Sequence, residues 1–325
     1  MHRVLVTGGT GFIGHHLVRK LIAQKYQVII LDNLSNSNKH FMQELETSQF
    51  IDQSVFLHKR DIRNKRAVSD TFRLESVDTC IHLAAKVSVQ DSLEKPHETI
   101  DVNVNGTLNI LQACCENGVK NLVFASSAAV YGHPTALPIP ECHTTQPLSP
   151  YGASKVGAEA LVSSFSSMID NCQILRFFNV YGEGQTPTYA GVIVRFMERL
   201  SNCLPPIIYG DGRQTRDFIH VNDVVRAIVM ASKIRQNVRT KCCGLNTLNI
   251  GTGRPTSVLE LARTMIDIFS PGKEIEPTYS KPLKGDILHS YADIRKTKEL
   301  LGFLPEEELR SGLKKTSDSI TTTLK

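Results

Sequence analysis

The sequence predicts an α/β protein with a doubly wound parallel sheet and a smaller α/β lobe in the C-terminal half. Two observations favour this fold. Short apolar segments alternate with helix-like patterns over the first half of the chain, and a glycine-rich turn separates the first such segment from the first helix. Strands that are apolar on both faces are typical of parallel sheets that helices cover on both sides.

The apolar segments give the order of the strands. We expect strands at residues 4–6, 28–32, 55–57, 80–84, 122–125 and 174–178. A helix should follow the glycine-rich turn to about Ala23, and residues 103–115 have the apolar spacing of another. Ser149 suits an N-cap and Pro150 the first helical position, so a further helix should begin there.

Beyond Asn179 the pattern becomes irregular, with Gly and Pro frequent at residues 182–187 and at Pro205-Pro206. We therefore expect residues 1–178 to form the first domain and residues 179–325 mainly the second lobe. The chain should return to the first domain at about residues 217–250.

The composition is that of an ordinary globular protein, with 325 residues, 41% of them hydrophobic, and a net charge of +5. The basic residues are scattered, which argues against a nucleic-acid or membrane surface and fits an anionic small molecule equally well. No apolar stretch is long enough to span a bilayer, and the first residues enter a strand rather than a signal peptide.

The eight cysteines include no Cys-x-x-Cys pair, and four of them form two adjacent doublets. Several lie in apolar contexts that are typical of buried thiols. We expect a reducing, cytoplasmic location, with neither a metal site nor a disulfide framework.

The glycine-rich turn carries the first functional signal. Gly8, Gly11 and Gly14 are spaced three apart between a strand and a helix. Glycines at these places permit a tight turn, a close approach to a pyrophosphate and close packing of the helix on the strand. Asp32 follows at the end of the next strand, near the expected distance of ~20 residues. The pattern predicts a Rossmann-type dinucleotide site.

Asp32 also favours NAD over NADP. Its carboxylate can bond both ribose hydroxyls and would repel a 2′-phosphate, and residues 33–38 contain no Arg or Lys to accept one. Asp61 follows the third expected strand, where an adenine edge would lie. A helix N-cap before Arg63 is an equally good interpretation of Asp61.

Tyr151 and Lys155 lie four residues apart, so on a helix their side chains share one face. An ammonium beside a phenol favours the phenolate, which lowers the pKa of the phenol and makes it a usable general base. For an isolated pair, a chance arrangement would be the better interpretation. The rest of the chain favours the functional one.

These motifs together resemble the extended short-chain dehydrogenase/reductase superfamily, and the likeness covers nearly the whole chain. Within it, the sequence is most similar to nucleotide-sugar 4-epimerases that act on UDP-hexoses. The resemblance includes Ser126-Ser127 after the fifth strand and several longer stretches: residues 82–85, 103–107, 176–182, 212–218 and 285–290.

The resemblance implies a role for each matching residue. Tyr151 would be the general base, Lys155 would hold the nicotinamide ribose and lower the Tyr151 pKa, and Ser127 would bond the sugar hydroxyl. The residues implied to bind NAD are Gly8, Gly11, Phe12, Ile13, Gly14, Asp32, Asn33, Asp61, Ile62, Leu83, Ala84, Ala85, Asn103, Tyr151, Lys155 and Phe178.

The substrate residues are implied in the same way. Asn179 and Arg216 would hold the diphosphate, which suits the planar fork of an arginine, and residues 189–192 would pack against the uracil. Alternatively, Arg216 is a strand-edge charge paired with Asp217. The full set implied to bind the UDP-sugar is Ser88, Ser127, Asn179, Val192, Tyr209, Arg216, Asp286 and Ser290. A homodimer is also implied, through residues 103–115 and 151–165.

Two alanines narrow the reaction. The 4,6-dehydratases of this superfamily have an Asp-Glu pair after the catalytic Ser or Thr, where this chain has Ala128 and Ala129. Neither side chain can move a proton, which argues against dehydration. UDP-glucuronate decarboxylases carry an acid at the second position and are disfavoured too. The remaining course is oxidation at C4, rotation of the bound 4-ketose and return of the hydride to the other face.

Ser290 bears on the choice of sugar. In the family that this chain resembles, members with Tyr at this position are confined to plain hexoses. Members with a small residue there also accept N-acetylated sugars. We expect UDP-GlcNAc/UDP-GalNAc, UDP-Glc/UDP-Gal or both, unless Ser290 only accompanies other changes in packing. The family usually has Arg at the position of Leu283, for a contact with the diphosphate. The neighbouring Lys284 could replace it only as a point charge, without the bidentate geometry of Arg.

Two other functions stay open. A UDP-glucuronate 4-epimerase would need a cation for the C6 carboxylate near residues 86–88 or 189–195, and Lys86 is a candidate. A non-catalytic NAD-binding regulator would have no need of Ser127, Tyr151 and Lys155 together.

Overall fold

The computed structural model describes residues 2–47, 54–185, 191–234, 245–270, 272, 274–283 and 285–323. The chain divides into two compact units. Unit 1 comprises Met1–Tyr131, Thr145–Arg176 and Val225–Leu248, and unit 2 comprises Gly132–Thr144, Phe177–Val224 and Asn249–Lys325. Each unit has its own core, so each is described by itself.

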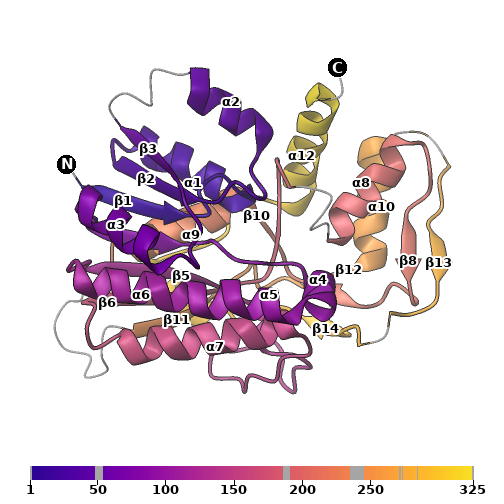
Figure 1. The fold of residues 1–325 in the computed structure, drawn as a ribbon. Coiled ribbons are helices and arrows are strands. Elements are labelled where there is room, and N and C mark those ends of the chain that lie inside the picture. The colour runs from indigo at the N-terminus through magenta and orange to yellow at the C-terminus, as the bar shows by residue number, and fades with distance from the viewer. Residues whose placement is uncertain are drawn as a thin grey trace. The chain divides into compact units, whose positions relative to one another are not determined.

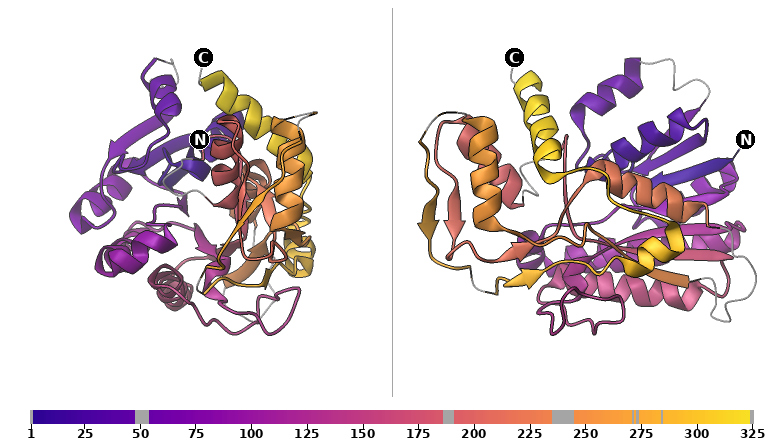
Figure 2. Two further views of the ribbon diagram at one scale, coloured as in Figure 1. Left: turned by 90° about the vertical axis from the view of Figure 1, so that its right-hand side faces the viewer. Right: turned by 180° about the vertical axis from the view of Figure 1, so that it is seen from behind.

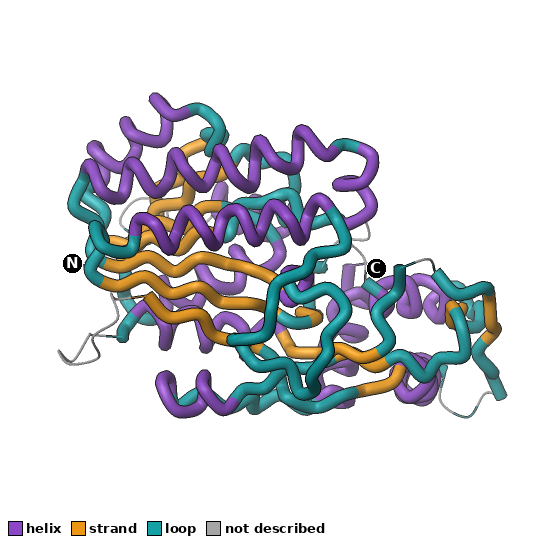
Figure 3. Tube along the Cα trace, turned by 90° about the horizontal axis from the view of Figure 1, so that it is seen from below, coloured by secondary structure: helices purple, strands orange, loops and turns teal. Residues whose placement is uncertain are grey.

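A sheet of seven described strands forms the centre of unit 1, in the order β11-β6-β5-β4-β1-β2-β3. All the pairs from β5 to β3 in this order are parallel, and Figure 3 shows the strands side by side between layers of helices. The doubly wound parallel sheet is therefore confirmed. Its strands are β1 (Arg3–Thr7), β2 (Gln27–Asp32), β3 (Val55–Lys59), β4 (Thr79–His82), β5 (Asn121–Ser127), β6 (Asn171–Phe177) and β11 (Leu245–Ile250).

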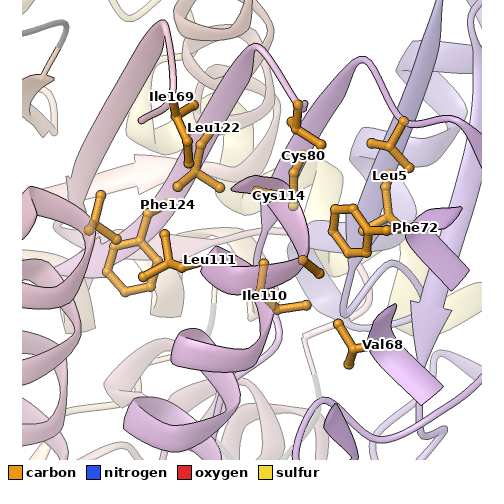
Figure 4. Close-up of a cluster of buried hydrophobic side chains, with 14 of the residues drawn as sticks. Leu5, Val68, Phe72, Cys80, Ile110, Leu111, Cys114, Leu122, Phe124 and Ile169 are labelled. Atoms are coloured by element: carbon orange, nitrogen blue, oxygen red, sulfur yellow. The ribbon is translucent and has the colours of Figure 1, made fainter. Parts of the chain in front are cut away.

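Helices cover both faces of this sheet (Figures 1 and 2). On one face, α3 (Lys65–Glu75), α6 (Gly106–Glu116) and α7 (Pro150–Phe165) contribute to one buried apolar cluster with alternate strand residues such as Leu5 and Phe124 (Figure 4). On the other face, α1 (Phe12–Ala23) brings Val18 and the glycine-rich turn against Ile30. Burial on both faces explains why the strands are apolar throughout.

Further helical segments lie wholly or partly in unit 1. They include a π-helical turn, η1, and a single 3-10 turn, η2. These segments are α2 (Lys39–Thr47), α4 (Val89–Glu94), α5 (Pro96–Ile100), η1 (Asp101–Asn105), η2 (Ala128–Val130) and α9 (Val221–Ser232), the last of which begins in unit 2.

Unit 2 has small sheets, β7 with β10, β12-β9-β14, and β8 with β13, packed with α8, α10 and α12 around their own apolar cluster. Its strands are β7 (Asn179–Tyr181), β8 (Ile207–Tyr209), β9 (Thr215–Arg216), β10 (Phe218–His220), β12 (Thr256–Ser257), β13 (Thr278–Ser280) and β14 (His289–Ser290). Its helices are α8 (Val192–Ser201), α10 (Val258–Phe269), α11 (Arg295–Leu301) and α12 (Leu309–Thr323).

The division of the chain differs from the expected one in two places. Gly132–Thr144 groups with unit 2 rather than with the rest of residues 1–178, because Ile139 exchanges backbone hydrogen bonds with the segment around Ala292. The segment that returns to unit 1 begins at Val225, within α9, and not at residue 217.

Two elements also differ in their ends. The fourth strand stops at His82 rather than at residue 84, because the Thr7 side chain binds the next two backbone N–H groups. The expected helix at 103–115 begins as the π-helical turn η1, which contains Asn103, and becomes α-helical only at Gly106. Turns of this kind are frequently functional.

The described residues also bear on the thiols, on metal binding and on membrane spans. The six cysteines among them are free. No cluster of three or more His, Cys, Asp or Glu side chains in the described ranges could hold a metal ion. None of the helices that the structure describes has both the length and the apolar character needed to cross a bilayer.

Candidate functional site

The glycine-rich turn forms a tight backbone cradle at the end of β1. Gly8 has a φ of 68°, and a Cβ there would lie 2.8 Å from the Ala84 nitrogen. The Gly11 N–H donates to the Gly8 carbonyl at 3.1 Å. Only glycine combines this backbone angle with so close an approach.

The helix that follows presents an uncompensated N-terminus. Gly11 is the N-cap of α1, with no side-chain cap, and the first turn, which starts with Phe12 and Ile13, contains no acidic residue. The helix dipole and the N–H groups therefore suit an anion. The turn fits the pyrophosphate of a dinucleotide in both shape and charge.

Asp32 ends β2 with its carboxylate fixed in place. Its Oδ2 accepts from the Thr10 N–H at 3.0 Å, and its Oδ1 accepts from the Leu34 N–H at 2.8 Å. Asp32 is buried, and its bond from the Thr10 N–H ties the end of β2 to the glycine-rich turn. Each oxygen keeps a further lone pair, which is what a ribose diol needs.

Asp61 is part of an exposed charged cluster and does not cap a helix. Arg63 forks onto its two oxygens at 3.0 and 2.9 Å, and Asn33 donates to Oδ2 at 3.0 Å. The hydrogen bonds from Arg63 are the largest influence, and they hold the Asp61 pKa well below its usual range. The N-cap of α3 is Asn64 instead, so the N-cap interpretation of Asp61 was wrong.

A buried chain of side-chain hydrogen bonds fixes the loop after β4. The Thr7 hydroxyl accepts from the Leu83 and Ala84 N–H groups, both at 3.1 Å, so its own proton goes to His82 Nδ1 at 2.6 Å. His82 must then carry its proton on Nε2, which donates to Thr107 at 3.0 Å. Burial lowers the His82 pKa to about 3, which keeps the ring neutral.

Asn103 links this loop to the helix that carries Tyr151. Its Oδ1 accepts from the Lys86 N–H at 2.8 Å, and its amide nitrogen donates to the Lys86 carbonyl at 2.9 Å and to Ser154 at 2.8 Å. Ser154 in turn donates to the Tyr151 carbonyl at 2.7 Å. Because both amide N–H groups are used within the protein, only Oδ1 remains for the implied contact with the cofactor.

The expected helix start at Ser149 and Pro150 is confirmed. The Ser149 hydroxyl accepts from the Gly152 N–H at 3.1 Å, and Pro150 is the first helical residue. A Cβ on Gly152 would lie 2.6 Å from the Ala129 carbonyl oxygen, so this first turn packs directly against η2. That contact brings Tyr151 beside Ser127, whose hydroxyl bonds the phenol.

The sequence predicted a lowered pKa for Tyr151, and this direction was wrong for the protein alone. Burial is the largest influence and raises the Tyr151 pKa, although the bond from Ser127 lowers it in part. The Lys155 ammonium instead donates to the Ala125 carbonyl at 2.8 Å and lies 5.0 Å from the centre of the Phe124 ring. In the protein alone, the lysine therefore does not make the phenol more acidic.

Lys155 is buried, and burial lowers its pKa to about 8 from 10.5, with Glu159 opposing this change. Between these pH values the unfolded chain binds more protons than the native protein, so stability rises with pH. Between about pH 8 and pH 10.5, we expect the free energy of unfolding of the NAD-free protein to rise by on the order of 3 kcal/mol relative to that of Lys155→Met. Urea unfolding of both proteins from pH 7 to 10.5 measures the difference, and parallel curves would contradict it.

Next to Lys155 lies a buried ion pair that the sequence analysis did not single out. Arg176 of β6 donates to both oxygens of Glu159, at 2.9 and 2.6 Å, and Ser126 donates to the same carboxylate at 2.5 Å. Arg176 also lies 4.8 Å from the centre of the Tyr131 ring. Glu159 lies four residues after Lys155 and eight after Tyr151, and this helical spacing could have placed it on the same face in the sequence.

Unit 2 brings three of the implied substrate residues together. Arg216 forms an ion pair with Asp286, and β9 pairs with β14 so that Ser290 lies opposite Arg216. The guanidinium Nη1 also donates to the Thr215 carbonyl at 2.8 Å. The alternative pairing of Arg216 with Asp217 was wrong, since Asp217 is buried and bonded elsewhere.

The other implied residues are divided between the units. In unit 1, Ser88 caps α4 by accepting from the Asp91 N–H at 3.0 Å, while Ile62 is buried and Ala85 lies in the loop after β4. In unit 2 lie Phe178 and Asn179 at the start of β7, Val192 at the start of α8, and Tyr209 at the end of β8. Lys284 and residues 189–190 lie outside the described ranges.

Comparison with known proteins decides the family. The model of the family described as GDP-mannose 4,6 dehydratase matches residues 5–316. The chain belongs to this family. The family's name includes dehydration, but the positions after Ser127 are Ala128 and Ala129, in η2.

Several solved structures with similar folds are 4-epimerases. A UDP-glucose 4-epimerase of Thermotoga maritima, solved with UDP-glucose, has a TM-score of 0.89 and 35% identity, with 99% of this chain and 100% of that one covered. A UDP-N-acetylglucosamine 4-epimerase of Methanobrevibacter ruminantium gives 0.87 and 32%, over 99% of each chain. The UDP-glucose 4-epimerase of Thermus thermophilus, a complex with NAD, gives 0.84 and 32%, over 98% and 99%. The resemblance to UDP-sugar 4-epimerases is therefore confirmed.

Proposed function

We propose that this chain inverts C4 of a UDP-hexose with NAD as its cofactor. The observation that carries this proposal is the hydrogen-bonded pair of Ser127 and Tyr151 beside buried Lys155, followed by two alanines that cannot move protons. The pair supplies what reversible oxidation of an alcohol needs. The alanines leave the resulting ketone without the acid and base for dehydration.

In this proposal Tyr151 removes the proton of the C4 hydroxyl and later returns it. The glycine cradle and Asp32 would hold NAD, which would supply the reversible hydride acceptor for this oxidation. Ser127 bonds the same oxygen and directs it toward the phenol. Because the phenol is buried and its pKa is raised, the charge that makes it a base at neutral pH must come from groups bound beside it.

The bound 4-ketose must turn over between the two hydride transfers. The pocket then has to hold the nucleotide firmly and the sugar loosely. Arg216 suits the first task, since its planar fork matches phosphate oxygens, and Asp286 keeps that fork oriented through their ion pair. We assign the diphosphate to Arg216 and Asn179, and the uracil to the segment that ends at Val192.

We propose that the sugar pocket admits an N-acetyl group because position 290 is Ser. A Tyr ring there would occupy the space of the acetamido group, which costs binding through steric overlap. Ser290→Tyr should lower kcat/KM for UDP-GlcNAc at least about tenfold and leave UDP-Glc within about twofold. Parallel assays with both substrates measure the ratio, and an unchanged ratio would remove Ser290 from the specificity argument.

A UDP-glucuronate 4-epimerase is the second candidate within this family. Its C6 carboxylate needs an available cation, and Lys86 is the described candidate in unit 1. Its ammonium is paired with Glu98 at 2.9 Å, with both side chains about one-third exposed (35% and 38%). The carboxylate of Glu98 compensates the charge that the substrate would need, so we favour a neutral sugar.

Two further properties belong to this proposal. We propose a homodimer through α6 and α7, together with the neighbouring exposed apolar side chains Val89 and Leu93 of α4, which are 47% and 56% exposed. We also propose that the protein works in the reducing cytoplasm, where its free thiols would persist. Light scattering after gel filtration tests the dimer, and a monomer at micromolar concentration would contradict it.

The product assay tests the proposed function. Purified protein should be incubated separately with UDP-Glc, UDP-GlcNAc and UDP-glucuronate, and the products separated by anion exchange. We expect the C4 epimer of one or both neutral substrates. Turnover of UDP-glucuronate alone would favour the second candidate, and NAD binding without any turnover would favour a regulatory protein.

A further inference from the structure

Asp217 is a buried carboxylate that belongs to neither the implied cofactor set nor the implied substrate set. It follows Arg216 of β9, precedes Phe218 of β10, and has no exposed surface. A buried charge is costly unless donors surround it. Unit 2 must therefore supply hydrogen-bond donors to this carboxylate.

Four donors surround the carboxylate. Oδ1 accepts from the Thr252 N–H at 2.7 Å and from the Thr252 hydroxyl at 2.6 Å. Oδ2 accepts from the Gly253 N–H at 2.9 Å and from the Ala292 N–H at 3.1 Å. Burial raises the Asp217 pKa and these donors oppose it. A set made only of donors fits the ionised carboxylate.

These bonds join the segments that carry the implied substrate residues. Ala292 lies two residues after Ser290, and β14, which contains Ser290, pairs with β9 beside Arg216. The Asp217 carbonyl accepts from the Asn179 N–H at 2.9 Å. One residue thus connects the backbones of all three substrate segments.

The packing around the carboxylate leaves no room for adjustment. A Cβ on Gly251 would lie 2.6 Å from Asp217 Oδ2 and 2.9 Å from the Ala292 Cβ. Gly251 precedes the two residues, Thr252 and Gly253, that bond the carboxylate. Glycine at this place lets the loop come close enough to donate.

We propose that Asp217 is a positioning residue that sets Arg216 and Asn179 in the geometry that binds the nucleotide diphosphate and holds the Ser290 strand beside Arg216. The proposal rests on the proposed function for the identity of that ligand. It assigns Asp217 no contact with the substrate and no role in the hydride transfer. Its loss should therefore weaken nucleotide binding and leave NAD retention unchanged.

Asp217→Asn tests this with little change in shape. If the NH₂ group replaces Oδ2, it faces the Gly253 and Ala292 N–H groups, and two hydrogen bonds are lost. If it replaces Oδ1, the Thr252 hydroxyl can turn to accept from it, but the Thr252 N–H loses its acceptor. Titration calorimetry with UDP on the NAD-loaded protein should show a Kd raised at least about tenfold. Absorbance of released NAD and thermal unfolding are measured on the same samples.

Asp223→Asn is the matched control. Asp223 is also buried in unit 2 and accepts from the backbone N–H groups of Glu306 and Glu307, at 3.0–3.1 Å, but these residues belong to no substrate segment. We expect Asp223→Asn to lower the melting temperature and leave the UDP Kd within about twofold. An equal rise in Kd for both variants would reduce Asp217 to a general stabilising role.

If Asp217→Asn does not fold, two variants of Thr252 test the same proposal. Thr252→Ala removes the 2.6 Å hydroxyl donor to Asp217, together with the acceptor of the Arg254 N–H at 3.2 Å, and should raise the UDP Kd about threefold. Thr252→Ser keeps both bonds of the hydroxyl and should match the wild type. UDP affinities unchanged in Asp217→Asn and Thr252→Ala would overturn the proposal. Because the assay needs no turnover, wild-type protein that binds UDP without epimerising would refute only the proposed function.

Discussion

Replacing Tyr151 with Phe should reduce C4 epimerisation by about 10²–10⁴-fold, the usual contribution of a positioned acid–base group. The substitution removes one oxygen, which bonds Ser127 in the native protein, and leaves the ring buried in place. The glycine cradle and Asp32 are unaffected. We therefore expect the variant to keep NAD at the wild-type ratio, and an initial-rate assay with a coupled product measurement gives the loss.

Tyr279→Phe is the matched control for this variant. Tyr279 lies on β13 of unit 2 and is 57% exposed, so loss of its hydroxyl should leave the rate within about twofold. Wild-type-like turnover by Tyr151→Phe would refute the assignment of the base. Loss of NAD together with activity would instead indicate damage to the fold of unit 1.

Gly14→Ala should abolish NAD retention. A Cβ on Gly14 would overlap the Gly8 carbonyl oxygen and lie 2.7 Å from the Gly9 Cα. Both contacts are with backbone, and the Gly8 carbonyl is fixed by the Gly11 N–H. The helix must move away from the turn, which separates its N-terminus from the pyrophosphate. Purified Gly14→Ala should contain less than about one-tenth of the wild-type NAD and unfold at a lower temperature.

Gly157→Ala provides the control for the same change of side chain. Its added Cβ would meet Val104 Cγ2 at 3.6 Å, an ordinary contact, within α7. Alanine favours a helix over glycine by about 0.5–1 kcal/mol, so this variant should keep its NAD and unfold at or slightly above the wild-type temperature. If Gly14→Ala behaves like Gly157→Ala, the glycine turn is not the dinucleotide site.

The sequence was sufficient for the sheet and for the start of the catalytic helix, because both depend on local patterns. Buried parallel strands are apolar on both faces, and Ser149 with Pro150 is a strong local helix signal. The placement of Gly132–Thr144 depends on hydrogen bonds between Ile139 and a segment about 150 residues away along the chain. No local pattern encodes such a contact.

The chemistry of the site was predictable in its residues and less so in its electrostatics. The Tyr151–Lys155 spacing identified the pair, but it could not show that the ammonium binds the Ala125 carbonyl. The direction of the Tyr151 pKa depends on burial, which is a property of the whole fold. The ion pair of Glu159 with Arg176 and the true partners of Asp217 were missed for the same reason, since these partners are distant in sequence.

The most direct measurement follows a deuterium atom at C4 of the UDP-hexose that the product assay identifies. Protein carrying its own NAD is incubated with this substrate in ordinary water, with no NAD added. Inversion through a transient 4-ketose predicts the C4 epimer with deuterium still at C4. Deuterium lost to water, or found at C6 of a dehydrated product, would contradict C4 inversion by Tyr151 and Ser127.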